Sequence, residues 1–287
     1  MPSFSHAQRD RQFPASYRFG LMIGLALLMA ACEQQSRGPR VDVTPLLEAE
    51  GVVFETATLL VRRQSDGAEW YSNEGRLEQR YSPASTAKIP HTYIALESGV
   101  ATPETQYAWD GKERAISSWN QAQTLSTAYE RSAVWVYQAI AQTLGHTTMA
   151  EWIDLTDFGN QNIGTPEDLT TYWLRGPLAV SANEQVRFLV TVAQEELPFS
   201  PGTYRAARDI MTEAQGEGWT LYAKTGLASR NGRSSIGWYV GWVDTVDDRG
   251  KTDTYYFALN IDILSPEDIG KRQSAVQTVL RQIGVLS

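Results

Sequence analysis

The sequence predicts a mixed α/β (α+β) fold, in which an antiparallel sheet is built from both ends of the chain and a mostly helical region lies between them. Strand-like segments occur near residues 52–73 and again over 219–263. Residues from about 85 to 215 have helical patterns, and a last helical pattern follows the final strand. This order of strands, helices, strands and a helix favours helices packed on one antiparallel sheet.

The strands are indicated by apolar and β-branched runs between polar turns. VVFETATLLVRR at 52–63, the turn QSDG and then AEWYSN predict a β-hairpin. Three later strands are expected at 219–226, 236–244 and 254–263, joined by glycine-containing turns such as DDRG. A site would lie where this sheet meets the helical region.

Several helix starts can be located from capping residues. Ser181 and Glu184 predict a capping box. Thr165-Pro166 and Ser200-Pro201 have proline at a first helical position. Ser265-Pro266-Glu267 is expected to begin a terminal helix that continues to about Val285.

Composition excludes several classes of function. The formal net charge of -8 comes from scattered acidic residues, so the sequence shows no basic surface for nucleic acid. With three histidines and one cysteine, the chain has no Cys/His metal cluster and no disulfide framework, and a Ser/His/Asp triad is nearly excluded. A serine nucleophile would therefore need a base other than histidine.

The first 31 residues predict an export signal. Basic residues precede FGLMIGLALLMAA, an apolar run of 13 residues that is too short to span a bilayer. LMAAC resembles a bacterial lipoprotein box in which Cys32 becomes the lipidated first residue, and a plain signal with an incidental cysteine is the alternative. We expect a signal peptide over 1–31, a lipidated Cys32 with a polar tether over 32–45, and the folded domain over 46–287 of an exported, periplasmic protein.

Ser85-Thr86-Ala87-Lys88 stands at the expected start of a helix. Residues three apart share a helix face, so the Ser85 hydroxyl and the Lys88 amine would be neighbours. Lysine can activate the serine only if a dry setting lowers its pKa from the ordinary ~10.4. A capping serine with a surface lysine is the alternative. Pro90 implies a late helix start or a kink.

Ser132-Ala133-Val134 is expected within a helix over about 125–144. Apolar residues recur around Ser132 at helical spacing: Leu125, Tyr129, Val136, Ile140 and Leu144. The Ser132 hydroxyl would then point inward, either to a site or to a carbonyl one turn back.

Lys224-Thr225-Gly226 is expected to end a strand at a sheet edge. Backbone groups there could pair with an extended acyl-amide ligand, while Lys224 and Thr225 contact its carboxylate and Gly226 permits close approach. An ordinary strand end before the turn ASRNGRSS is the alternative. In the terminal helix, Arg272 interrupts an apolar stripe and either reaches water or faces an anion in a cleft.

The combined motifs resemble the class D serine β-lactamases, the oxacillinase group, over about residues 52–285. The resemblance rests on PASTAKIPHTYIALESG, SAVWVYQAIA, FGN at 158–160, WLRGPLAVSANEQVRFL from Trp173, KTG, GWYVGWVD and NIDI. Val134 stands where most other penicillin-recognising enzymes carry asparagine, which favours class D over classes A and C and the transpeptidases. Two departures are Ala87, where the family often has an aromatic residue, and Phe158, which replaces the tyrosine of the usual YGN.

The resemblance implies roles for individual residues. Ser85 would be the acylated nucleophile, and Lys88 would react with carbon dioxide to give a carbamate base. Ser132 would relay protons, and the Trp173 indole would donate a hydrogen bond to the carbamate. Val134 and Leu174 would form a dry pocket wall, and Phe158 would keep the ring of the usual YGN tyrosine. Lys224, Thr225 and Arg272 would bind the substrate carboxylate, and Gly226 would permit close approach of the substrate. The N–H groups of Ser85 and Leu227 would form the oxyanion hole.

The resemblance therefore predicts hydrolysis of β-lactam antibiotics, small molecules, with a resulting resistance to them. No metal and no cofactor is expected apart from the carbon dioxide adduct on Lys88, and membrane contact is expected only through a lipid on Cys32. The alternatives are a penicillin sensor or a transpeptidase-like protein that forms a long-lived acyl-serine. A sensor of this fold needs transmembrane helices and an intracellular output segment, which this sequence does not display.

Overall fold

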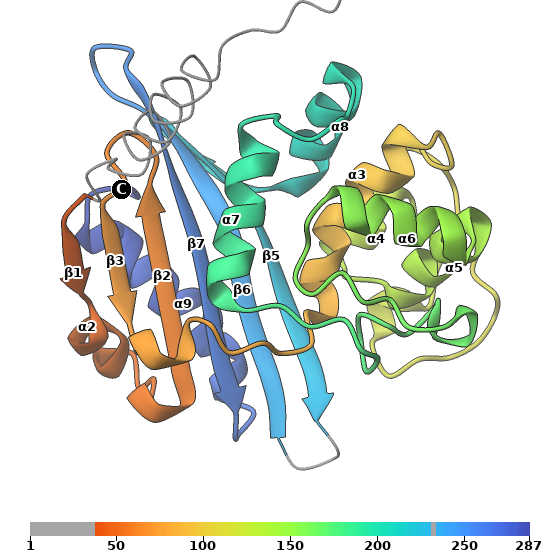
Figure 1. Ribbon diagram of the computed structural model, residues 1–287, viewed down its shortest axis with the longest axis horizontal. Helices are drawn as coiled ribbons and strands as arrows, with labels where there is room; N and C mark the ends of the chain where they lie inside the picture. The colour runs from red at the N-terminus through yellow and green to blue at the C-terminus, as the bar shows by residue number, and fades with distance from the viewer. Residues whose placement is uncertain (1–37, 231–233) are drawn as a thin grey trace, which may run out of the picture. The chain divides into compact units, whose positions relative to one another are not determined.

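The computed structural model describes residues 38–230 and 234–287, and it confirms the predicted mixed α/β fold (Figure 1). The strands are β1 (Arg40–Asp42), β2 (Ala57–Arg63), β3 (Glu69–Ser72), β4 (Thr212–Gly216), β5 (Trp219–Arg230), β6 (Ser234–Val246) and β7 (Thr252–Ile263). The helices are α2 (Thr44–Ala49), α3 (Lys88–Glu97), α4 (Leu125–Glu130), α5 (Val134–Leu144), α6 (His146–Leu155), α7 (Ala182–Ala193), α8 (Pro201–Met211) and α9 (Asp268–Gln282).

These strands form one sheet in the order β1-β3-β2-β7-β6-β5-β4. The central pair β2–β7 joins the N-terminal hairpin to the C-terminal strands, so the sheet is built from both ends of the chain as predicted. All neighbours are antiparallel except β1 and β3, which run parallel.

The sheet is buried on both faces. Along β7, Phe257 and Leu259 pack in the core beneath α9, while Tyr256 and Ala258 lie in the larger core on the side of α7. Alternate strand residues point to opposite faces, so one strand supplies both cores. Figure 1 shows α2 and α9 on one face and α7 on the other, with α3 to α6 grouped beyond the β5 edge.

Three predicted boundaries needed correction, and one strand was missed. Arg40–Asp42, assigned to the tether, instead form the edge strand β1 beside β3. The hairpin strand begins at Ala57, because residues 54–56 form a 3₁₀ turn. The terminal helix begins at Asp268, whose carboxylate accepts hydrogen bonds from the N–H groups of Leu264 and Ser265, and it ends at Gln282. β4 was not anticipated.

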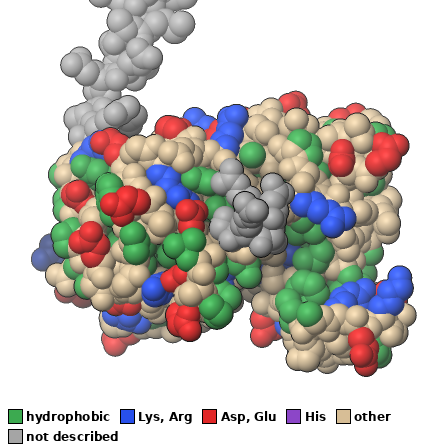
Figure 2. Space-filling view, turned by 90° about the horizontal axis from the view of Figure 1, so that it is seen from below, with side chains coloured by type: hydrophobic (Ala, Val, Ile, Leu, Met, Phe, Trp, Pro, Cys, Tyr) green, Lys and Arg blue, Asp and Glu red, His purple; other side chains and the backbone are tan. Residues whose placement is uncertain are grey.

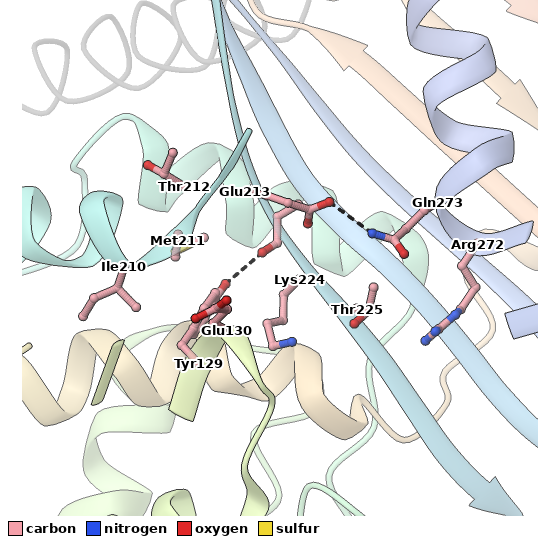
Figure 3. Close-up of a pocket in the computed structure, with 11 residues that line it drawn as sticks. Tyr129, Glu130, Ile210, Met211, Thr212, Glu213, Lys224, Thr225, Arg272 and Gln273 are labelled. Carbon is pink, nitrogen blue, oxygen red and sulfur yellow. Dashed lines mark hydrogen bonds between the residues drawn. The ribbon is translucent and has the colours of Figure 1, made fainter. Parts of the chain in front are cut away.

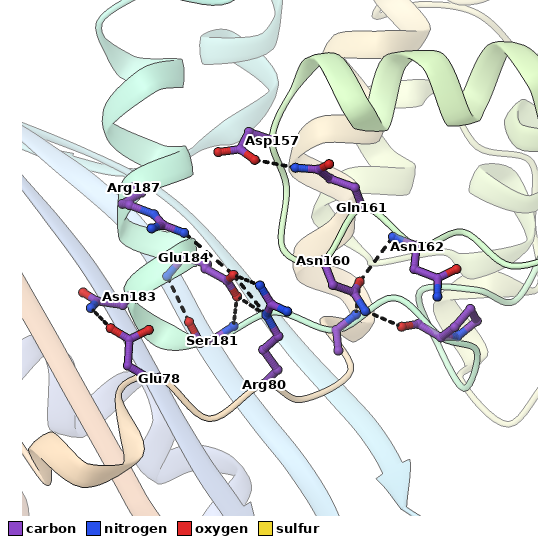
Figure 4. A network of polar contacts seen from close by, with 12 residues as sticks. Glu78, Arg80, Asp157, Asn160, Gln161, Asn162, Ser181, Asn183, Glu184 and Arg187 are labelled. Carbon is purple, nitrogen blue, oxygen red and sulfur yellow. Dashed lines mark hydrogen bonds and ion pairs between the residues drawn. The ribbon is translucent and has the colours of Figure 1, made fainter.

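The capping box of α7 is confirmed, and its Glu184 also forms an ion pair outside the helix. The Ser181 hydroxyl accepts from the Glu184 N–H, and the Glu184 carboxylate accepts from the Ser181 N–H. The same carboxylate pairs with Arg80, which lies just before the Ser85 segment (Figure 4). Nearby, the Asn160 side chain bonds to the backbone of Pro177 and Ala179. The start of α7 is thus tied to the segment that leads to Ser85.

The predicted signal and Cys32 fall outside the described residues. Within 38–230 and 234–287, no helix combines the length and apolarity that crossing a bilayer requires. The face drawn in Figure 2 carries acidic and basic side chains interspersed with apolar ones.

Candidate active site

Ser85 lies on a short 3₁₀ turn, Ala84–Ala87, that runs directly into α3. Ala84 has a left-handed backbone with φ of 49°, a conformation that costs free energy for a residue with a Cβ and that clusters at functional sites. The predicted neighbours are confirmed: Lys88 Nζ lies 2.9 Å from Ser85 Oγ. Pro90 falls in the first turn of α3, where its missing N–H removes no helical hydrogen bond, as the late-start interpretation required.

Lys88 is fully buried, so it is not a surface lysine. Burial lowers its pKa well below the ordinary value, and the nearby charge of Lys224 lowers it further. The Nζ atom lies 5.1 Å from the centre of the Tyr137 ring, and among the described residues no carboxylate forms an ion pair with it. A buried lysine without a counter-ion favours the neutral amine.

Ser132 does not lie within a helix, contrary to the prediction. The segment is broken into α4 and α5, and Ser132 has φ of 59° at the break. Its N–H donates to the Tyr129 carbonyl and the N–H of Ala133 donates to the Ala128 carbonyl, which is a Schellman ending with serine where glycine is usual. The Ser132 hydroxyl is buried and has no hydrogen-bond partner in the described structure, so the local bond to a preceding carbonyl is not made.

Lys224-Thr225-Gly226 lies in the middle of β5 and not at its end, because the strand continues to Arg230. The edge position is nevertheless correct: β4 pairs with β5 only as far as Tyr222. Beyond that point the Ala223 carbonyl accepts from the Tyr129 hydroxyl instead of from a strand. Backbone groups alternate between the two edges of a strand, so those of Thr225 and Leu227 face the same open edge as Ala223.

Gly226 permits this edge to lie close to the nucleophile turn. A Cβ there would stand 3.0 Å from the Pro83 carbonyl oxygen and 3.1 Å from Thr86 Cγ2. On the other side of the turn, the Ser82 hydroxyl donates to the carbonyls of Trp173 and Leu174 at 3.0 and 3.2 Å. The turn carrying Ser85 is therefore held between β5 and the Trp173 segment.

Lys224 is buried, and its ammonium lies 5.4 Å from the centre of the Tyr129 ring (Figure 3). Burial lowers its pKa to about 8, against the opposing influence of Glu213. No carboxylate of the described residues forms an ion pair with Lys224, so it presents an unpaired cation to the pocket that it lines.

Arg272 faces the cleft and does not extend into water. Its side chain is buried, with Nη1 donating to the Gly226 carbonyl at 2.7 Å and Nε to the Ile269 carbonyl at 2.8 Å. It lines the same pocket as Lys224 and Thr225. The three residues that the resemblance assigned to a substrate carboxylate are thus brought together.

Trp173 is fully buried, and its indole Nε1, a donor only, has no partner in the described structure. Its ring meets that of His91 edge-on at 4.8 Å. His91 follows Lys88 by three residues on α3, so Trp173 packs against the helix face that carries Lys88.

Sequence reasoning missed the aromatic lining of this region. His91 Nε2 lies 2.5 Å from the Tyr172 hydroxyl, and burial lowers the pKa of His91 to about 3, so the ring is neutral. Tyr137 pairs with Thr92, whose hydroxyl also donates to the Lys88 carbonyl. The spacing of His91 and Thr92 from Lys88 on one helix was the available signal.

The remaining predicted residues are dispersed. Val134 is half-buried at the start of α5, and Leu174 is half-buried beside the nucleophile turn. The Leu227 side chain is 46% exposed. Phe158 is fully buried in the core, edge-to-face with Phe188, and it is not among the residues that line the pocket of Figure 3. In the described ranges no three His, Cys, Asp or Glu side chains are grouped as metal ligands.

Comparison with known proteins agrees with this geometry. Residues 55–283 match the family described as the penicillin binding protein transpeptidase domain. The chain is 39% identical over 233 residues to β-lactamase OXA-3 of Pseudomonas aeruginosa, covering 80% of each chain. Among solved structures, the class D β-lactamase YbXI from Nostoc superposes with a TM-score of 0.80 at 33% identity, over 86% of this chain and 100% of that one.

A second solved structure is the C-terminal domain of the BlaR penicillin receptor from Bacillus licheniformis. It superposes with a TM-score of 0.78 at 25% identity, over 87% of this chain and 97% of that one. The sequence identity, the fold and the close pairing of Ser85 with Lys88 agree: this chain belongs to the class D β-lactamases, which are serine enzymes that hydrolyse β-lactams.

Proposed function

We propose that the chain hydrolyses β-lactam antibiotics through an acyl-serine on Ser85, with a carbon dioxide adduct on Lys88 as the general base, and that this activity confers resistance. The observation that carries the proposal is the setting of Lys88. Its amine is buried without a counter-ion, its pKa is lowered, and it stands 2.9 Å from Ser85 Oγ. Only a neutral amine can form a bond to the carbon of CO₂ and release a proton.

Two buried donors without partners are available to such an adduct. The unpaired indole N–H of Trp173 and the unpaired hydroxyl of Ser132 are both buried, and each would otherwise remain unsatisfied at a cost. When bound, the adduct would supply a carboxylate-like oxygen that accepts the proton of Ser85 and later that of water. Val134 and Leu174, both half-buried, would limit the access of water.

The chain's own residues then divide the remaining work. The Ser85 oxygen attacks the lactam carbonyl carbon, the C–N bond breaks, and the ring nitrogen receives a proton that Ser132 relays. The N–H groups of Ser85 and Leu227 stabilise the oxyanion, because the Leu227 backbone faces the open edge of β5. Lys224, Thr225 and Arg272 bind the substrate carboxylate. Water then attacks the acyl carbon and releases Ser85.

Location is part of the proposal. An exported protein, retained at a periplasmic membrane by lipid on Cys32, would meet β-lactams outside the cytoplasm. The support is the sequence of residues 1–32 alone. Labelling cells with a radioactive fatty acid tests it, because Cys32→Ser should abolish incorporation and leave β-lactamase activity intact.

Repeated turnover of a chromogenic cephalosporin by the purified protein tests the proposed function. We expect many hydrolytic events per molecule, and loss of turnover with retained fold in Lys88→Ala. The likeness to the BlaR receptor domain supports one alternative, a sensor. A single stoichiometric burst with a stable acyl-serine would establish that alternative and refute catalysis.

A further inference from the structure

A pocket of about 390 Å³ continues from the carboxylate-binding residues toward β4. Lys224, Thr225 and Arg272 form one part of its lining, and Glu130, Glu213 and Gln273 form another (Figure 3). Ser85 is not among the lining residues. The pocket therefore shares the proposed carboxylate-binding groups but not the nucleophile.

Substrate chemistry determines what would enter this space. In a bicyclic β-lactam the ring carboxylate is on a carbon next to the one that bears the second ring's substituent. With the lactam carbonyl at Ser85 and the carboxylate at Lys224 and Arg272, that substituent would project into the pocket.

Two carboxylates face this space. Glu213 is held through Oε1, which accepts from the Tyr239 hydroxyl at 2.8 Å and from Gln273 Nε2 at 3.1 Å. Both bonds end on Oε1, so Oε2 is not occupied by either donor. Glu130 is exposed at the end of α4. The carboxylate of Glu213 is thus oriented by the protein and not free to turn away.

The charge balance changes when substrate binds. The two cations that face the pocket, Lys224 and Arg272, balance Glu130 and Glu213 in the free enzyme. A bound substrate carboxylate adds one negative charge, so the local sum becomes negative. A positive group on the substituent would offset that charge, and a negative one would add to the repulsion.

We infer that Glu213, assisted by Glu130, makes this enzyme prefer β-lactams with a cationic substituent beside the ring carboxylate over neutral ones, and disfavours anionic ones. The inference rests on the proposed function, since it assumes that substrates acylate Ser85 with their carboxylate at Lys224. Both glutamates are solvent-exposed, so each contributes a modest, salt-sensitive selectivity.

The test compares three cephalosporins with the same side chain on the lactam ring. Their six-membered rings carry a pyridiniomethyl, an acetoxymethyl or a (carboxymethyl)thiomethyl group. We expect Glu213→Gln to lower the kcat/KM of the cationic compound, relative to that of the neutral one, by roughly 2- to 5-fold. It should raise the kcat/KM of the anionic compound, relative to that of the neutral one, by a similar factor. This size is typical of an exposed charge pair. Adding Glu130→Gln should enlarge both changes, and high salt should reduce them.

Glu217→Gln is the matched control, because it removes the same charge from an exposed residue just after β4 that does not line this pocket. It should leave the three relative values unchanged. If Glu213→Gln changed kcat/KM equally for all three compounds, or for none of them, the inference would be overturned. Turnover of the neutral compound would still support the proposed function in that case. Failure to turn over the neutral compound would refute the function itself.

Discussion

Replacing Trp173 by phenylalanine tests the base most selectively. The substitution removes the buried indole N–H that has no protein partner and keeps an aromatic ring beside His91. If this N–H donates to the carboxylate-like adduct on Lys88, a charge-assisted hydrogen bond worth about 1.5–3 kcal/mol is lost. Since 1.4 kcal/mol corresponds to a tenfold change in a binding constant, the affinity of Lys88 for CO₂ should fall roughly 10- to 100-fold.

The assay is the steady-state rate of cephalosporin hydrolysis at increasing bicarbonate concentration. The Trp173→Phe enzyme should be slow in CO₂-depleted buffer and recover with added bicarbonate, at a half-saturating concentration raised by that factor. Trp242→Phe is a matched control, because Trp242 is also fully buried with an unpaired Nε1 and stacks on Tyr222. A Trp173→Phe enzyme with normal turnover and normal bicarbonate dependence would refute the reasoning.

Four further outcomes are expected. Ser132→Gly should lower kcat/KM by about 100-fold or more, since it deletes a proton relay. Chemical denaturation should show roughly 0.5–1 kcal/mol of added stability, because glycine adopts the left-handed backbone without strain. Normal activity of this variant would exclude the relay. Lys88→Met should raise the free energy of unfolding of the CO₂-depleted protein by about 1.4 kcal/mol for each unit by which burial lowers the pKa of Lys88. Because Lys88 binds its proton more strongly in the unfolded chain than in the folded one, this gain should shrink as pH rises toward 10.5. A difference in stability that does not change with pH would contradict the lowered pKa. The kcat/KM of the wild type should fall as pH rises through about 8, where Lys224 loses its charge, and Lys224→Arg should remove that fall. If kcat/KM of Lys224→Arg fell over the same pH range, the fall would come from another group. Arg272→Ala should raise KM several-fold with kcat little changed, and an unchanged KM would remove Arg272 from carboxylate binding.

The sequence predicted the parts of the site that depend on local spacing. Ser85 and Lys88 are three residues apart at a helix start, and helix geometry alone brings their side chains together. The longer strands were located because apolar and β-branched residues gather in runs between polar turns, although β5 and β6 extend beyond their predicted ends.

The features that could not be predicted depend on long-range contacts or on an exceptional backbone. The break at Ser132 has serine where glycine normally marks a helix end, so the apolar periodicity continued through it without interruption. The contact of Arg272 with the Gly226 carbonyl joins a helix to a strand, and only the packed fold shows it. The unpaired Trp173 indole likewise becomes visible only once every nearby acceptor has been located.

Carbon NMR after exposure to isotope-labelled bicarbonate tests the central claim most directly. The account predicts that the wild-type protein gives a carbamate carbon signal, that Lys88→Met does not, and that the signal and hydrolytic activity are lost together on CO₂ removal and return together. Fully active wild-type protein without that signal would contradict it.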